Sequence, residues 1–227
     1  MTDLQVTEQT RIKRGRKRGS YDRQLIHSII DEAMVAYLGM VIDGRPFVQP
    51  TSHWRDGDRI YWHGATKGRM IAGVEKRPVC LTLALLDGLV LARSAFHHSV
   101  NYRSVMLFGT PEVITDEAEK TRQLEIFIDR IAPQRWPTLR PMNSTELKAT
   151  GILSMPINEA SAKMRAEPPG DDEADYQWPV WAGVLPLAIF LGFRNNSAYD
   201  RYWEGRKLWG ELVLRSRNFA RQSLSLI

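Results

Sequence analysis

The chain has 227 residues, of which 43% are hydrophobic, so it can form one domain with a sizeable core, with or without an appendage. Its longest apolar run, 180–193, is interrupted by Pro186 and Gly192 and is shorter than the roughly 20 residues of a membrane-spanning helix. Cys80 is the lone cysteine, so no disulfide can form within the chain, and the N-terminus shows no signal-peptide pattern. The sequence therefore predicts a cytoplasmic protein without disulfides or a membrane span.

The net charge of +5 is concentrated near the N-terminus, and the rest of the chain is close to neutral. A basic segment of this kind can hold nucleic acid by charge, but it is more often a disordered, solvated terminus. No basic face with interspersed aromatic residues follows, so nucleic-acid binding is not favoured and 1–19 is predicted to be a disordered arm. The clustered cations are Arg11, Lys13, Arg14, Arg16, Lys17 and Arg18.

The first predicted elements are one helix and three strands. Apolar residues at helical spacing predict a helix that begins at Ser20 as its N-cap and ends near Ala36. The Asp43-Gly44 pair is typical of a hairpin turn, and a second turn covers 55–58. The strands that these turns join are expected at 37–42, 46–54 and 59–63.

Residues 61–70 change from a strand to a helix through a turn of small residues. A helix that begins near Thr66 leaves unpaired N–H groups, and with the helix dipole these form a seat for an anion such as phosphate. Lys67 adds positive charge there, and Trp62 and His63 supply flat surface beside it. The stretch therefore predicts a site for a nucleotide-like cofactor; the alternative is a plain strand–turn–helix corner with solvated basic residues.

The remaining elements continue an antiparallel pattern. Many strands joined by tight hairpins, with helices inserted singly, predict an α+β fold built on a β-barrel. The absence of βαβ alternation and of a GxGxxG motif excludes a Rossmann fold. We expect a hairpin over 79–94 with its turn at Asp87-Gly88, a bent strand over 102–114, helices over 116–131 and 144–150, and strands over 152–157 and 178–187.

Six segments carry a more specific signal through their order and spacing: Phe47–Ser52, Ile60–Arg69, Val79–Leu83, Leu91–Ser99, Asn101–Val105 and Trp178–Gly183. Together they resemble the pyridoxamine 5′-phosphate oxidase-like, FMN-binding split-barrel proteins, in particular the uncharacterised and nitroimidazole-resistance-like branches. The resemblance implies an antiparallel split β-barrel over 20–187. It also implies a homodimer with two FMN molecules in the clefts between the subunits.

The resemblance further implies the residues of the FMN site. A turn would hold the phosphate, strand residues and aromatic side chains would lie along the ring, and the partner subunit would add a tryptophan. The implied contacts are Pro50, Thr51 and Ser52 at the ring edge, Trp62 and His63 beside the ring, Thr66 and Lys67 at the phosphate, Arg103 and Ser104 on a long strand, and Trp181 from the partner.

The resemblance leaves the reaction open. Vitamin B6 oxidases carry an Arg-x-His element near the C-terminus that grips the substrate phosphate, and nothing after Trp178 supplies it, so that reaction is not implied. The favoured hypothesis is an FMN-dependent oxidoreductase with an unassigned small-molecule substrate and unassigned catalytic residues. The alternative is a non-catalytic flavin or haem carrier or regulator on the same barrel, with His63, His97 or His98 as an axial ligand.

Other polar residues have plainer interpretations. Arg93 and Arg103 are candidates for binding phosphate or substrate, or for pairing with acidic neighbours in the barrel wall. The histidine spacings match no zinc signature, so no metal-ion site is predicted.

A second resemblance begins at about Ala188, where residues 188–210 look like a piece of a bacterial bestrophin-type anion channel. A channel needs several spanning helices, and this segment does not make even one. We therefore expect 188–227 to be a helical appendage without channel function.

Overall fold

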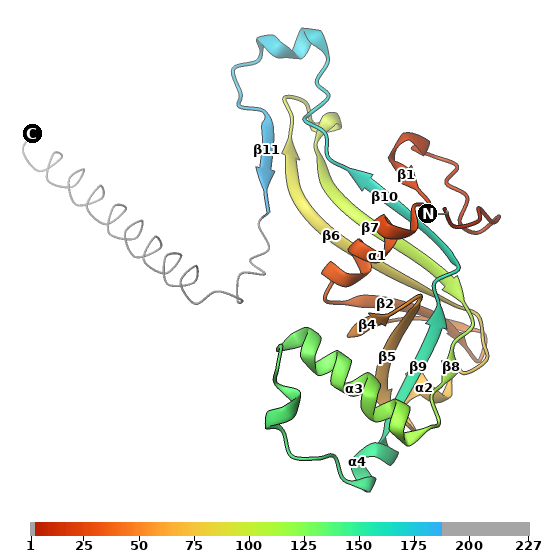
Figure 1. The fold of residues 1–227 in the computed structure, drawn as a ribbon. Coiled ribbons are helices and arrows are strands. Elements are labelled where there is room, and N and C mark those ends of the chain that lie inside the picture. Colours follow the sequence, from red (N-terminus) through yellow and green to blue (C-terminus); the bar gives the residue numbers. More distant parts are fainter. Residues whose placement is uncertain (1–2, 188–227) are drawn as a thin grey trace, which may run out of the picture. The chain divides into compact units, whose positions relative to one another are not determined.

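The computed structural model describes residues 3–187, which fold as two antiparallel sheets with inserted helices (Figure 1). This α+β arrangement confirms the predicted fold class and is the split barrel that the resemblance implied. Residues up to Leu187 form one compact unit, and the predicted appendage over 188–227 lies outside the described residues. The α-helices are α1 (Arg23–Glu32), α2 (Arg69–Ala72), α3 (Glu117–Ile131) and α4 (Ser144–Ala149).

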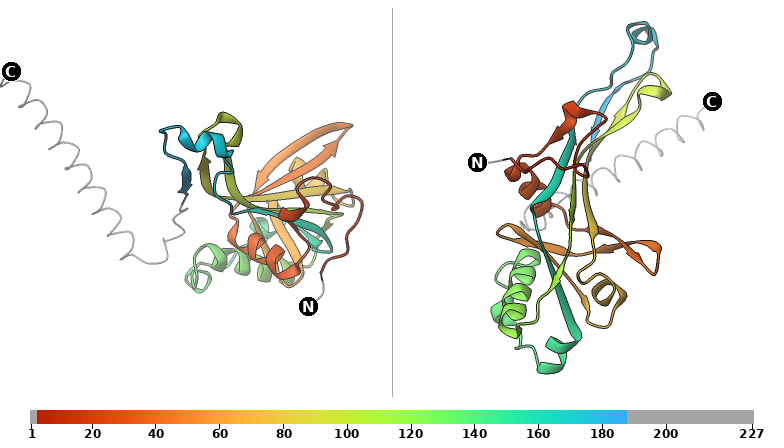
Figure 2. Two further views of the ribbon diagram at one scale, coloured as in Figure 1. Left: turned by 90° about the horizontal axis from the view of Figure 1, so that it is seen from above. Right: turned by 90° about the vertical axis from the view of Figure 1, so that its right-hand side faces the viewer.

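The larger sheet has the strand order β1-β10-β7-β6-β2-β3, with β11 added beside β6. The smaller sheet has the order β4-β5-β9-β8. Strands β6 and β7 extend well beyond their neighbours, and β11 pairs with the projecting part of β6 (Figures 1 and 2). The strands are β1 (Gly19–Ser20), β2 (Ala36–Ile42), β3 (Arg45–Thr51), β4 (His53–Asp56), β5 (Arg59–Ala65), β6 (Val79–Leu91), β7 (Ser99–Gly109), β8 (Glu112–Val113), β9 (Thr150–Pro156), β10 (Glu159–Arg165) and β11 (Gly183–Pro186).

The main core lies between α1 and the two sheets. Alternate residues of the central strands, such as Leu81 and Leu83 of β6, are fully buried there against Ile29 of α1. A second cluster fixes α3 to the smaller sheet and includes Trp54 and Leu124. Most of the apolar burial that holds the unit together therefore lies within residues 4–162.

Several predicted ends are confirmed because local signals define them. The Asp116 side chain accepts a hydrogen bond from the Glu119 N–H at 2.7 Å and so caps α3. The turn at Asp43-Gly44 has positive φ at both residues, as a tight hairpin requires. The long strand predicted over 102–114 bends after Gly109, where β7 ends.

Other boundaries differ from the prediction. Asp22, not Ser20, caps α1, since its carboxylate accepts the Leu25 N–H at 2.6 Å. The Asp87-Gly88 pair makes no hairpin turn; β6 continues through it to Leu91 with a bulge in its pairing with β7. The predicted strand over 178–187 is shortened to β11, and β10 was not predicted.

The N-terminal segment also differs from the predicted disordered arm. Leu4 is buried in the main core, and its N–H donates to the carbonyl of Tyr21 at 2.9 Å. Thr10 is likewise buried, and residues 16–18 form a short 3-10 helix. The arm is thus folded onto the barrel through contacts that its charge pattern does not reveal. Across 3–187, no helix is long and apolar enough to cross a membrane.

Candidate functional site

The turn after β5 differs from the predicted anion seat. Helix α2 begins at Arg69 with Gly68 as its N-cap, and it is a single short turn. The Thr66 N–H and hydroxyl donate to the carbonyls of Ala149 and Lys148 at 2.9 and 2.8 Å, so Thr66 does not cap the helix. These bonds tie the turn to the end of α4. Lys67 and Arg69 are both exposed cations at this turn.

The turn also approaches the larger sheet. The Arg69 guanidinium lies over the ring of Phe47 in β3, 4.7 Å from its centroid. At the other end of the same strand, Pro50 and Ser52 are exposed and Thr51 is 9% exposed. An edge strand with exposed ends thus lies beside a basic turn, which is a suitable surface for a flat anionic ligand.

The two aromatic candidates of β5 point in different directions. Trp62 is fully buried in the main core, so it presents no face to a ligand, contrary to the predicted ring contact. His63 is half-buried with its ring centroid 4.8 Å from that of Phe127 and 6.0 Å from that of Trp54. Burial lowers the pKa of His63 below its ordinary value, which keeps the imidazole neutral.

Arg103 is held by two carboxylates in the barrel wall. Its guanidinium pairs with Glu32 at the end of α1 and with Asp87 at the bulge of β6, at 2.7–3.0 Å for the Asp87 contacts. The hydrogen bonds to Glu32 raise the pKa of Arg103 most, and those to Asp87 raise it further. The pairing with acidic neighbours is therefore the interpretation that the structure bears out. Ser104 faces the other side of β7, and its hydroxyl donates to the Lys163 carbonyl at 3.3 Å.

Trp181 lies apart from these residues, on the segment that leads into β11. Its side chain is 66% exposed, and its ring packs against Gly183, where a Cβ would come within 2.7 Å of the ring. Tyr176 and Trp178 are also more than half exposed. Within residues 3–187, no hydrogen bond or ion pair links Trp181 to the other predicted site residues.

The projecting end of the larger sheet carries a pocket that the sequence did not predict. It has a volume of about 460 Å³ and includes Phe96, which is 89% exposed, together with His97 and His98. His98 Nδ1 donates to the carbonyl of Ser94 at 2.9 Å, which leaves Nε2 with the lone pair. The remaining lining residues are Arg18, Ser99, Arg165, Glu167, Pro168, Pro169 and Gly170.

The wall of this region is braced by a largely buried ion pair. The Arg93 N–H and guanidinium both donate to Asp171, at 2.8 and 2.9 Å, and the guanidinium lies over the ring of Tyr176. Asp171 lies in the acidic stretch 171–175, which is the one signal for this partner in the sequence. Among the residues that the structure describes, no group of three or more His, Cys, Asp or Glu side chains is placed to hold a metal ion.

Comparison with known proteins identifies the larger part of the chain. Residues 22–164 match the family described as pyridoxamine 5′-phosphate oxidase. The flavocytochrome Anf3 from Azotobacter vinelandii is similar over 80% of this chain and 85% of its own, with 46% identity and a TM-score of 0.76. The FAD and heme binding protein from Mycobacterium smegmatis is similar over 75% and 84%, with 35% identity and a TM-score of 0.71.

The C-terminal residues match a different family. Residues 178–227 match the family described as bacterial/fungal bestrophin protein. The voltage-dependent anion channel-forming proteins of Ralstonia nicotianae and Mesorhizobium japonicum are 62% and 66% identical over 42 and 43 residues, or 18% and 19% of this chain. The chain spans 14% of the length of each of these relatives.

Proposed function

Because this chain belongs to the pyridoxamine 5′-phosphate oxidase family, we propose that it is a cytoplasmic flavoprotein that binds FMN and oxidises or reduces a small molecule. The observation that carries the proposal is the 46% identity to a flavocytochrome over 80% of the chain. A bound flavin would supply hydride and electron transfer, while the protein orients the ring and excludes water.

The residues around the β5–α2 turn fit the phosphate end of such a cofactor. Lys67 is exposed there and would form a charge-assisted contact with a dianionic phosphate. The strand end at Pro50–Ser52 would follow the ring edge. His63 stays in the proposed set as a ring contact, but Trp62 is removed from it because the core encloses that side chain. Arg103 would shape the pocket wall rather than hold the cofactor, since two carboxylates occupy it.

We also propose that the protein is a homodimer that buries the outer face of the larger sheet. Tyr37, Thr82 and Met106 are cross-strand neighbours in one row, and Tyr37 and Met106 are 47% and 43% exposed. Val48 of β3 continues the face and is 70% exposed. An apolar sheet face of this kind favours a protein partner. In the dimer, Trp181 of one subunit would reach the site of the other.

An absorption spectrum of the purified protein tests the cofactor. We expect a flavin spectrum that is retained after FMN is added and the excess is removed, and mass spectrometry of the released flavin separates FMN from FAD. A colourless protein that retains neither flavin would contradict the proposal. The oxidoreductase activity needs a second result, namely that a nicotinamide or another donor bleaches the bound flavin and an acceptor restores its colour.

Lys67→Ala tests the phosphate contact. Removing one charge-assisted hydrogen bond should weaken FMN binding by about 1.5–3 kcal/mol, measured by titration of the flavin-free protein. Lys148→Ala is the matched control, because Lys148 is an exposed lysine at the end of α4 whose carbonyl, not its side chain, holds Thr66. Equal losses in both variants would indicate a general charge effect and place the phosphate elsewhere.

The second candidate function is haem binding in addition to flavin, favoured by the pocket that includes His97 and His98. His98 is the better axial ligand, because its Nδ1–H bond to a backbone carbonyl orients the ring and leaves Nε2 for a metal. We expect a Soret band after haem is added, lost in His98→Ala and kept in His97→Ala. A Soret band that survives both substitutions and disappears in His63→Ala would move the ligand to β5.

A further inference from the structure

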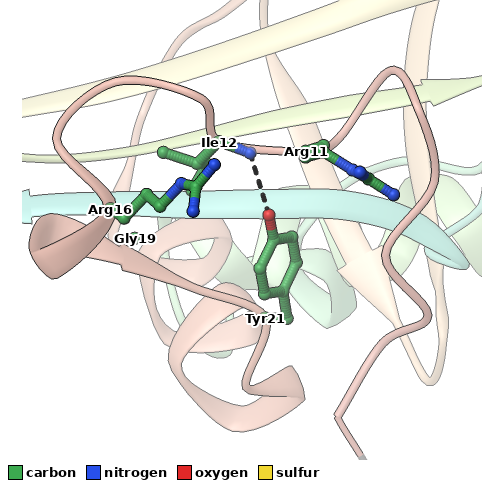
Figure 3. Close-up of a pocket in the computed structure, with 5 residues that line it drawn as sticks. All are labelled: Arg11, Ile12, Arg16, Gly19 and Tyr21. Atoms are coloured by element: carbon green, nitrogen blue, oxygen red, sulfur yellow. Dashed lines mark hydrogen bonds between the residues drawn. The ribbon is translucent and has the colours of Figure 1, made fainter.

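The basic N-terminal arm encloses a pocket of about 300 Å³ against the start of the barrel, with Arg11, Ile12, Arg16, Gly19 and Tyr21 around it (Figure 3). The Tyr21 hydroxyl closes the arm into a loop, because it accepts the Ile12 N–H at 3.0 Å and donates to the Thr10 carbonyl at 3.1 Å. Arg11 and Arg16 lie on opposite sides of the Tyr21 ring (Figure 3).

The loop has a fixed shape. Gly15 has a φ of +68° and begins the short 3-10 helix that carries Arg16. A Cβ at Gly19 would come within 2.4 Å of the Ile12 Cδ1, so the two segments of the arm approach each other closely there. The other end of the arm is anchored by the buried Leu4. The cations are thus held close together by contacts that do not involve their charges.

Most of the arm's cations have no acidic partner. Within residues 3–187, Arg18 pairs with Glu167 at 2.8 Å, and the other five form no ion pair. A further cation, Lys163 of β10, has its Nζ 3.7 Å from where a Cβ on Gly15 would lie. Holding like charges together in a folded loop costs free energy that an anion would recover.

We propose that this loop is a binding site for an oligophosphate, with Arg11 and Arg16 as its two phosphate-binding side chains. Guanidinium groups suit phosphate because they donate paired hydrogen bonds in a plane. Since the two arginines flank the Tyr21 ring rather than converge, a ligand with two or more linked phosphates fits better than a single phosphate ion. The site shares no residue with the proposed flavin-binding turn, so the oligophosphate proposal can be tested independently of the flavin proposal.

Calorimetric titration of the full chain with tripolyphosphate tests the site, with inorganic phosphate as the weaker comparison. The variant Arg11→Gln/Arg16→Gln should lose affinity by about tenfold or more. The control Arg14→Gln/Lys17→Gln removes the same charge from exposed positions of the same arm and should change affinity less than about threefold. Equal losses in the two double variants would overturn the proposal in favour of diffuse charge attraction.

Tyr21→Phe separates a built site from a charged tail. It removes the hydroxyl that closes the loop and leaves every charge in place, so we expect affinity to fall by about threefold to tenfold. Unchanged affinity in Tyr21→Phe would overturn the proposal, because the loop shape would then be irrelevant.

Binding to phosphatidylglycerol vesicles that tripolyphosphate displaces would assign the phosphates to a lipid surface. Binding to single-stranded DNA with no response to tripolyphosphate would also overturn it.

Discussion

His53 is a histidine that the fold keeps neutral. Its side chain is 2% exposed, and Nε2 donates to the carbonyl of Ile30 at the end of α1 over 2.9 Å. Burial, helped by the positive charge of Arg130, lowers the pKa of His53 to about 4, against the opposing effects of the Ile30 bond and of Asp31. Protonation of His53 is therefore coupled to unfolding.

The sign of this coupling gives a prediction for stability. In the unfolded chain the imidazole titrates near 6.5, so the unfolded state binds more protons as the pH falls below that value. The contribution of His53 is fully present above pH 6.5 and is lost by about pH 4, for a total of about 3 kcal/mol. His53→Gln keeps a donor for Ile30 and should flatten the fall in the free energy of unfolding measured with urea between pH 7 and pH 4.5.

Part of the fall should remain, because burial also lowers the pKa values of His27 and His63. His98→Gln is the control, since it replaces a histidine that is exposed on the projecting end of the sheet instead of a buried one. A slope in His53→Gln equal to that of the unaltered protein would show that His53 does not resist protonation in the folded state.

At the scale of elements, one buried hydrogen bond fixes α3 to the smaller sheet. Trp54 of β4 and Gln123 of α3 are both fully buried, and the indole N–H donates to the Gln123 Oε1 at 2.7 Å. The Gln123 amide donates in turn to Asp56 and Glu119, each at 3.0 Å. The network ties the helix to the turn between β4 and β5.

Gln123→Leu should lower the free energy of unfolding by about 1–3 kcal/mol, because it leaves the Trp54 N–H buried without an acceptor. The double-mutant cycle with Trp54→Phe isolates this pair, since phenylalanine has no N–H to leave unsatisfied. Chemical denaturation of the four proteins measures it. If Gln123→Leu costs as much in the Trp54→Phe variant as in the unaltered protein, the bond contributes nothing and the loss comes from packing alone.

The elements also show what the sequence could and could not predict. Helix α3 was predictable because its cap and its apolar spacing are local. Strand β10 was missed because small and charged residues alternate in it, and its pairing with β7 and β1 defines it. The prediction that Trp62 contacts the cofactor was wrong for a related reason, since the burial of Trp62 also depends on which elements pack against its strand. Strand β5 is covered on both faces, by the main core and by the α3 cluster, so its pattern gives no sign of which side chains face outward.

At the scale of the whole molecule, the described unit holds its own core. Both apolar clusters lie within residues 4–162, although the chain continues with residues that match another family. A chain that ends at Leu187 should therefore keep its unfolding midpoint within about 2 °C and keep its flavin. Differential scanning calorimetry and the flavin absorption of the two chains provide the comparison. A lower midpoint in the shorter chain would show that residues 188–227 contribute to the fold.

The last prediction concerns dimerisation through the outer face of the larger sheet. Met106 lies next to Thr82 in the row Tyr37–Thr82–Met106, and a carboxylate there would be buried without a partner in the proposed dimer. Met106→Glu should weaken dimerisation by at least about tenfold and, because the proposed site lies between subunits, should also reduce flavin retention. Light scattering coupled to size exclusion measures the mass.

Leu139→Glu is the matched control, since Leu139 is 39% exposed on the loop before α4 and lies off this face. It adds the same charge and should leave both mass and flavin unchanged. If the unaltered protein is a monomer that binds flavin, the dimer proposal is contradicted, and one chain must supply all of the flavin contacts. A Met106→Glu protein that stays dimeric with its flavin would instead require another interface, and the projecting end of the sheet, with exposed Trp178 and Trp181, is the next surface to alter.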